Sequence, residues 1–249
     1  MIPVFHPRYI LETQEWKNGT LIEKIWKEDI QRGLSKVQEP VYVYDLENGI
    51  NYIEDRYSFL GAIKMIKDHK LISFDYETTG IKPHHPDQKI ICTSVSCSAL
   101  QTFVWMNDPE KDEIFKKILQ NPEIMKTAHN SNFEDIWSEV KLGAKIQGWE
   151  WCSMNNAHIL DNRHGISGLK FQTYVNFGVC GYDDLVSPYL KARNKKEKGA
   201  NGINRIEEFI KKYGKKELMK YCGFDSIYGY MLTTKQMKEI GYECSHSRS

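Results

Sequence analysis

The stretch that decides the fold is ISFDYETTG, residues 72 to 80. Its apolar and β-branched residues predict a buried strand over residues 71 to 77. Side chains two positions apart leave the same face of a strand, so Asp75 and Glu77 are expected side by side. Two such carboxylates repel each other and lose hydration, which favours a compensating divalent cation. The alternative is a strand that ends at Phe74, followed by a solvated turn.

The segments around this strand predict a mixed sheet with helices packed on it. The order from residue 71 onward is three strands, then helix, strand and helix, which is typical of an α/β layer architecture. Asp108 and Pro109 are suited to begin a helix. The expected strands cover residues 38–44, 71–77, 89–97, 102–106 and 124–128, and the expected helices 57–69, 109–119, 132–142 and 215–240.

Length and composition limit the class of protein. The 249 residues can hold one large domain, expected over residues 37-249, and an N-terminal extension over residues 1-36. The net charge of +1 excludes a global field that attracts polyanions, so a nucleic-acid partner needs a local patch or a metal. The six cysteines contain no CxxC pair, and no apolar run has the length of a membrane span. We therefore expect a cytoplasmic protein without a membrane partner.

The final helix carries an acidic residue within its apolar face. Asp225 falls in the middle of an apolar stripe, and Tyr221 stands one turn earlier on the same face. An unpaired carboxylate there is costly, so Asp225 needs a partner, either a metal ion or a buried arginine or backbone amides. The stripe consists of Leu218, Tyr221, Cys222, Gly229 and Leu232.

A further carboxylate lies at the start of an earlier helix, in the segment KTAHNSNFEDIW, residues 126 to 137. Glu134 is placed at the edge of the packed face, where it can reach a cleft. It is also three residues after Ser131, which predicts a capping box. Asn130 or Ser131 could also cap the helix while Glu134 stays free to act as a ligand, so both alternatives stay open.

Three short patterns together carry a family resemblance. The D-x-E strand at 75–77, the N-x-x-F-E helix start at 130–134 and the Y-x-x-x-D helix at 221–225 resemble the exonuclease motifs of the DEDD superfamily, tyrosine subgroup. Their order resembles that of the 3′-to-5′ proofreading domain of family A, phage-type DNA polymerases, and SGLKFQTYVNFGV, residues 167 to 179, resembles a helical segment of those domains. The resemblance implies a ribonuclease H-like α/β fold, a mixed five-stranded sheet flanked by helices.

The resemblance also implies a catalytic site. Asp75, Glu77, Glu134 and Asp225 are expected to hold two divalent ions, Mg²⁺ or Mn²⁺. In such sites one ion generates hydroxide and the other stabilises the leaving 3′ oxygen. Tyr221 is expected to orient the attacking water, because a phenol with its usual pKa of about 10 stays protonated. Many members carry aspartate where this chain has Glu134, a difference that bears on rate and metal preference.

Four further residues match positions that contact the terminal nucleotides in the resembled domains, and a fifth lies next to them. They are Asn130, Phe133 and the backbone near Thr78 and Thr79, which the resemblance assigns to nucleic-acid binding, and the adjacent His129. His129 could join these contacts or close a β-turn. A free 3′ end can be splayed and its bases stacked on apolar or aromatic groups, which favours single-stranded or frayed substrates.

The expected activity is a metal-dependent 3′-to-5′ exonuclease that hydrolyses DNA to nucleoside monophosphates in phage or bacterial DNA replication or repair. Only 24 residues follow Asp225, so we expect a stand-alone exonuclease or one part of a split polymerase, with a separate DNA polymerase as partner. One alternative is an RNA exonuclease of ribonuclease D type. Another is a catalytically silent module that binds nucleic-acid ends or docks a polymerase.

Two segments lie outside these motifs. His6 and Pro7, in VFHPRYIL, faintly resemble the closing motif of uracil-DNA glycosylases, and we expect a structural role or a relic of a fused domain. The run KARNKKEK, residues 191 to 198, is either a clamp on backbone phosphates or a solvated loop.

Overall fold

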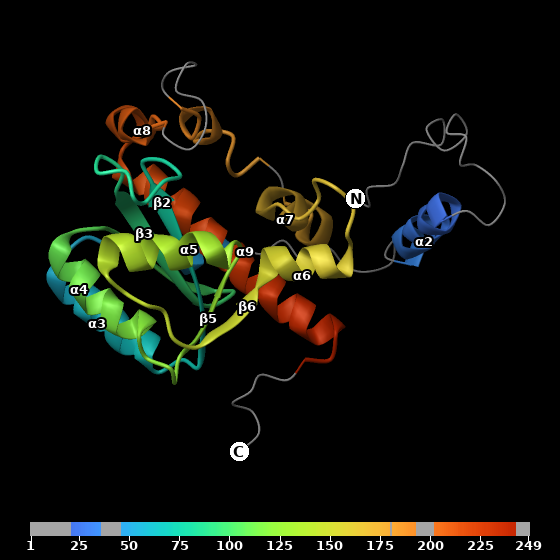
Figure 1. Ribbon diagram of the computed structural model, residues 1–249, viewed down its shortest axis with the longest axis horizontal. Coiled ribbons are helices and arrows are strands. Elements are labelled where there is room, and N and C mark those ends of the chain that lie inside the picture. Colours follow the sequence, from blue (N-terminus) through green and yellow to red (C-terminus); the bar gives the residue numbers. More distant parts are fainter. Residues whose placement is uncertain (1–20, 36–45, 180, 193–201, 243–249) are drawn as a thin grey trace.

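The computed structural model describes residues 21–35, 46–179, 181–192 and 202–242. Its centre is a mixed sheet whose six strands follow the order β1-β4-β3-β2-β5-β6, with helices on both faces (Figure 1). The pairs β1/β4, β2/β5 and β5/β6 are parallel, and β3 is antiparallel to both β2 and β4. The predicted α/β fold class is confirmed. The strands are β1 (Ile50–Ile53), β2 (Leu71–Thr78), β3 (Ile90–Ser98), β4 (Gln101–Met106), β5 (Met125–Ala128) and β6 (Trp149–Cys152).

The predicted number of five strands is wrong. Four of the predicted strands match β2, β3, β4 and β5, and the fifth, over 38–44, lies outside the described residues. The sequence did not predict β1 and β6, the two edge strands. Each has only four residues, which is too short for a recognisable alternation, and each is fixed by pairing with one neighbour.

The helices agree with the predicted ones where the sequence pattern was long. A π-helical turn, Ser138–Leu142, extends α5, and Asp108 caps α4 by accepting a hydrogen bond from the Lys111 amide. Two 3₁₀ turns, Leu46–Gly49 and Ser187–Tyr189, complete the elements. The helices are α2 (Leu21–Ser35), α3 (Arg56–Lys67), α4 (Pro109–Leu119), α5 (Ser131–Trp137), α6 (Ser153–Leu160), α7 (Leu169–Phe177), α8 (Ile206–Tyr213) and α9 (Lys215–Glu239). Within the described part of the chain, none of them is long and apolar enough to span a membrane.

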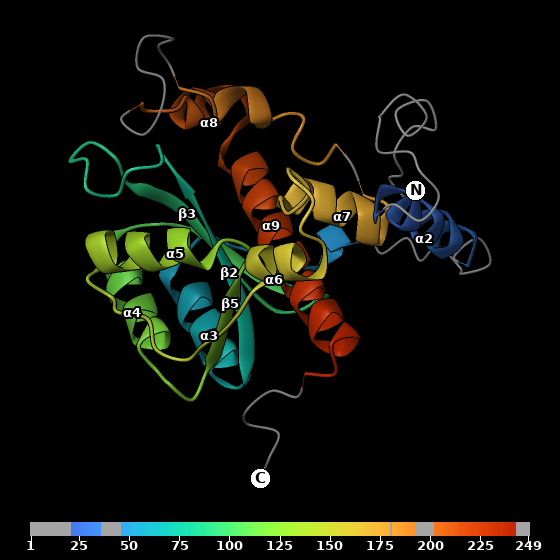
Figure 2. The ribbon, with the colours of Figure 1, turned by 45° about the vertical axis from the view of Figure 1, so that its right-hand side comes forward.

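Successive side chains of β2 point to opposite faces of the sheet, and each face is covered by different helices. Ile72, Phe74 and Tyr76 enter a core that also contains residues of α3 and α4, among them Phe59 and Phe115. The other face of the sheet is covered by α9, which packs against β2, β3 and β4 (Figure 2). The polar face of β2 therefore lies beneath the final helix.

Two glycines allow α9 to approach the sheet closely. A Cβ at Gly223 would lie 3.1 Å from side-chain carbons of Ile50 and Val104, and a Cβ at Gly229 would lie 2.7 Å from the Ser73 hydroxyl. Contacts this short require neighbouring atoms to move. The two positions thus set how close the helix lies to β2.

Candidate active site

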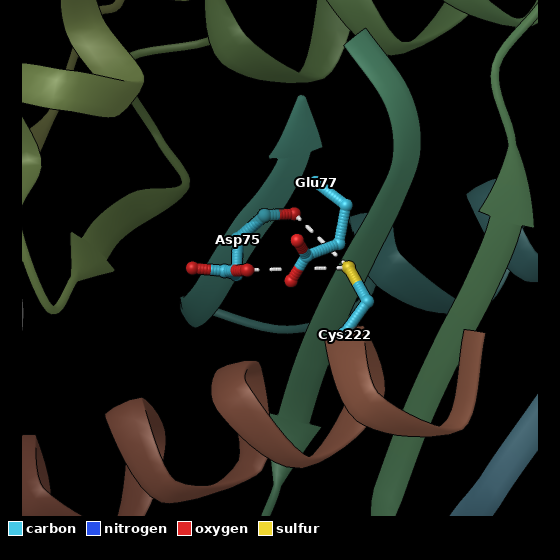
Figure 3. A group of neighbouring side chains, drawn as sticks. All are labelled: Asp75, Glu77 and Cys222. Atoms are coloured by element: carbon cyan, nitrogen blue, oxygen red, sulfur yellow. Dashed lines mark hydrogen bonds between the residues drawn. The ribbon is translucent and has the colours of Figure 1, made fainter. Parts of the chain in front are cut away.

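The two acidic residues of β2 share one face, as predicted. The strand continues to Thr78, so the alternative in which it ends at Phe74 is wrong. Glu77 is 6% exposed, whereas Asp75 is half-buried. Ligand atoms of Asp75, Glu77 and Cys222 all lie within 4.8 Å of one another (Figure 3).

The environment of these carboxylates opposes their ionisation. Burial raises the pKa of Asp75, and the negative charge of Asp225 raises it further. Burial likewise raises the pKa of Glu77, and Asp75 adds to the effect. Like charges in a desolvated site disfavour the ionised form, so a bound cation would strongly favour it.

Glu134 enters the same electrostatic environment from α5. It is 3% exposed, and burial followed by the charge of Asp75 raises its pKa. The predicted capping box is absent, because Asn130 is the N-cap residue and the helix start has no side-chain capping hydrogen bond. The buried Oε2 atom of Glu134 has no hydrogen-bond partner. Of the two alternatives, the structure therefore has the one in which Glu134 is free.

Asp225 is satisfied by two side chains that the sequence did not indicate. It is 7% exposed, and its Oδ1 atom accepts hydrogen bonds from the Lys170 ammonium and, at 2.7 Å, from the Tyr182 hydroxyl. The predicted non-metal partners, an arginine or backbone amides, are wrong. Lys170 lies inside the stretch 167–179 that carries part of the family resemblance, and this was the available signal for it.

Tyr221 lies beside this network. The centroid of its ring is 6.2 Å from that of Tyr182 and 4.4 Å from the Lys170 ammonium. Burial, followed by the charge of Asp225, raises its pKa well above the usual value. The phenol therefore keeps its proton at neutral pH, which agrees with an orienting role.

Cys222 extends from α9 toward the acidic pair of β2 (Figure 3). Its thiol donates weak hydrogen bonds to the backbone oxygen of Asp75 at 3.7 Å and to Oδ2 of Asp75 at 4.0 Å (Figure 3). Burial, followed by its contact with Cys92, raises the pKa of the thiol. Mg²⁺ and Mn²⁺ prefer oxygen ligands to sulfur, so we assign Cys222 to holding Asp75 in place.

Thr78 and Thr79 lie immediately after the acidic pair and are both buried. Their hydroxyls are engaged locally, that of Thr78 with the Gly80 carbonyl at 2.5 Å and that of Thr79 with the Lys89 amide at 2.9 Å. Both carbonyls accept hydrogen bonds from Asn204, which holds the end of β2 in place.

The other three predicted nucleotide contacts lie just after β5 and in the first turn of α5. Nδ1 of His129 is 2.9 Å from the Ser153 hydroxyl, and burial lowers the pKa of this imidazole to about 4. Nε2 of His129 has no hydrogen-bond partner. The Asn130 side chain makes no capping bond, and the half-buried Phe133 ring packs on Trp137 at 5.7 Å between centroids. His129 is thus a neutral hydrogen-bonding group at physiological pH.

The donor set fits divalent metal ions. Asp75, Glu77, Glu134 and Asp225 supply carboxylate oxygens, the ligands that Mg²⁺ and Mn²⁺ prefer. The unpartnered Oε2 atom of Glu134 and the raised pKa values of the buried acids both indicate that a positive charge is missing. Among the described residues, Lys170 is the one cation in an ion pair with these acids.

Comparison with known proteins gives a family and a fold. A family model described as 3′-5′ exonuclease matches residues 50–241, whereas no curated protein matches the chain. RNase D of Trypanosoma brucei in its GMP complex is similar with a TM-score of 0.58 at 14% identity, over 76% of this chain and 57% of that chain. The Aedes aegypti Nibbler EXO domain gives 0.53 at 10% identity, over 81% and 95%. Brucella melitensis NrnC bound to pGG gives 0.50 at 14% identity, over 77% and 81%. At these identities the likeness supports the ribonuclease H-like fold alone.

Proposed function

Because the chain belongs to the 3′-5′ exonuclease family, we propose that it is a metal-dependent enzyme that hydrolyses single-stranded or frayed DNA from the 3′ end. Its products are nucleoside monophosphates. The observation that carries the proposal is the set of four carboxylates from β2, α5 and α9, for which the described residues supply one paired cation. This charge imbalance is what a pair of divalent ions would offset.

The metal-binding roles follow from the donor atoms. Asp75, Glu77, Glu134 and Asp225 would hold two divalent ions, Mg²⁺ or Mn²⁺. When bound, the ions supply an activated water and stabilise the leaving 3′ oxygen. Tyr221, protonated at neutral pH, would donate or accept a hydrogen bond that orients that water.

The nucleotide contacts are proposed around the ends of β2 and β5. The side-chain amide of Asn130 makes no capping hydrogen bond to the helix. Phe133 presents a half-buried ring on which a base can stack. His129 would contribute a hydrogen bond and no charge, because its pKa is lowered to about 4. Thr78 and Thr79 would shape the site through their backbone, since their hydroxyls are already engaged.

RNA is the second candidate substrate. Similarity in fold to RNase D, a protein whose structure has been solved with RNA U12, favours it. The ribose 2′-hydroxyl is the group by which a protein distinguishes RNA from DNA at one site. We keep DNA first because the motif order resembles that of proofreading domains. A role in DNA replication or repair and a separate polymerase partner stay predictions.

A cleavage assay tests the proposal. Single-stranded DNA and RNA of matched sequence, each labelled at the 5′ end, are incubated with the full chain and Mg²⁺ or Mn²⁺. A ladder shortening from the 3′ end, stronger on DNA and abolished by a chelator and by Asp75→Asn, is expected. Asp87→Asn, an exposed aspartate in the loop after β2, serves as the matched control and should remain active.

The outcomes separate the candidates. A stronger ladder on RNA would replace DNA with the second candidate. Intact substrates under both metals would contradict the catalytic assignment and favour a silent module that binds nucleic-acid ends.

A further inference from the structure

Lys170 places a fixed positive charge inside the acidic site. It is the second residue of α7, and its side chain is 34% exposed. Its ammonium is bonded to Oδ1 of Asp225 and lies 3.0 Å from the Tyr182 hydroxyl. The same ammonium stands 4.3 Å from the centroid of the Tyr182 ring and 4.4 Å from that of Tyr221. Two aromatic rings and a carboxylate thus hold it in one position.

The positive charge of Lys170 is paired with Asp225 and with none of the other three carboxylates of the site. Both lone pairs of Asp225 Oδ1 are engaged, since the atom accepts hydrogen bonds from Lys170 and Tyr182. In the described part of the chain, no ion pair reaches Asp75, Glu77 or Glu134. The β2 pair is therefore open to a cation, whereas Oδ1 of Asp225 is already bonded to one.

We propose that Lys170 is an internal competitor for the metal ion that Asp225 binds. An ion held by Asp75 and Glu77 binds without displacing it. An ion on Oδ1 of Asp225 must displace the ammonium, and an ion on Oδ2 is repelled by it, because two positive charges at one carboxylate repel each other strongly in a site of low polarity. The two ions consequently bind with unequal affinity, and Lys170 sets the difference.

The inference rests on the proposed two-ion site, and a purely supporting role for Lys170 makes the opposite prediction. If the ammonium only oriented Asp225 for the metal, its removal would weaken metal binding, as the loss of orienting contacts does in other sites. If it competes, its removal strengthens binding. The sign of the change in affinity decides between them.

The experiment is a Mn²⁺ titration of the metal-free full chain without nucleic acid, with free Mn²⁺ measured by electron paramagnetic resonance. We expect one tight and one weak site in the unaltered protein. Lys170→Met keeps the aliphatic stem and removes the charge. It should tighten the weak site by about 10-fold or more, since hydrogen bonds between charged groups are worth at least one such factor.

Two matched variants control for charge and for folding. Lys170→Arg keeps the charge and should leave the weak site weak. Lys220→Met removes a lysine on α9 that pairs with Glu47 at 2.6 Å, and it should change neither affinity. If Lys170→Met does not fold, as judged by circular dichroism, Lys170→Gln takes its place.

Unchanged or weaker Mn²⁺ binding in the charge-removing variant would overturn the inference. The result is separable from the nuclease assay. Tightening in a protein that cleaves no substrate would support the inference and contradict the proposed function. Metal-dependent cleavage without tightening would contradict the inference alone.

Discussion

Substitution of Gly229 by alanine tests how closely α9 must lie to the sheet. Gly229 stands one turn after Asp225, and a Cβ there would be 2.7 Å from the Ser73 hydroxyl on β2. The Ser73 hydroxyl is buried and has no hydrogen-bond partner. The added methyl group therefore forces either the hydroxyl to rotate or the helix to move away from the strand that carries Asp75 and Glu77.

Two opposing effects determine the size of the change. Replacing glycine by alanine within a helix stabilises it by about 1 kcal/mol. Overpacking of a dense interior costs about 1–3 kcal/mol. Gly229→Ala should therefore lower the free energy of unfolding by about 0–2 kcal/mol. Combined with Ser73→Ala, which removes the clashing oxygen, it should instead raise that free energy by about 1 kcal/mol relative to Ser73→Ala alone.

The assay is a double-mutant cycle by chemical denaturation of the metal-free protein. The expected coupling between positions 73 and 229 is about 1–3 kcal/mol. Gly61→Ala is the matched control, because Gly61 lies within α3 and a Cβ there would meet no atom within 4 Å. This control should stabilise the protein by about 1 kcal/mol. Exonuclease activity should fall in Gly229→Ala and recover in the double variant.

Additive effects of the two substitutions would refute the reasoning. So would a Gly229→Ala variant that gains the same stability as Gly61→Ala. Either result would mean that the contact between α9 and β2 has room for an added methyl group. The close approach would then be no requirement for the position of Asp225.

Three further predictions concern the site itself. Since burial raises the pKa of Glu134, the folded protein keeps a proton that the unfolded chain, with a usual pKa of about 4.3, has released. The stability that protonated Glu134 contributes is complete below the pKa of Glu134 in the unfolded chain, and it is lost as pH rises through its pKa in the folded protein. The melting temperature of the metal-free protein should therefore fall less steeply with rising pH in Glu134→Gln than in the unaltered protein. The exposed Glu139→Gln should keep the original slope, and equal slopes in all three proteins would contradict the assignment. Mn²⁺ at about 100 times its dissociation constant should stabilise the protein by about 2.7 kcal/mol, and Asp75→Asn should abolish most of this gain in thermal melts; a full gain in the variant would exclude Asp75 as a ligand. Tyr221→Phe should slow single-turnover cleavage by about 10²-fold while Mn²⁺ affinity stays the same, and an unaltered rate would remove Tyr221 from the mechanism.

Local sequence patterns determined much of the fold. The period of two in residues 71–78 decides which side chains leave each face of β2, and this places Asp75 and Glu77 together before any partner is known. Asp108 followed by Pro109 encodes the start of α4, and the long apolar pattern after residue 215 encodes α9. These features depend only on residues a few positions apart, so they can be predicted directly from the sequence.

The sequence predicted part of the candidate active site. An aspartate within the apolar stripe of the final helix required a partner, and the order of three motifs indicated the family. From the sequence, Glu134 could either close a capping box with Ser131 or stay free as a ligand. The spacing that allows the capping box does not require it, so the sequence left both alternatives open. Packing of α5 decided the matter by burying Glu134 without a cap.

The partners of Asp225 were decided by tertiary structure alone. Lys170 and Tyr182 precede it by 55 and 43 residues, and no local period links positions so far apart. The short edge strands β1 and β6 likewise exist because β4 and β5 offer them hydrogen bonds. Sequence by itself thus fixed the face on which each side chain emerges. The packing of distant elements decided which groups meet there, since those contacts form only when the chain has closed its long loops.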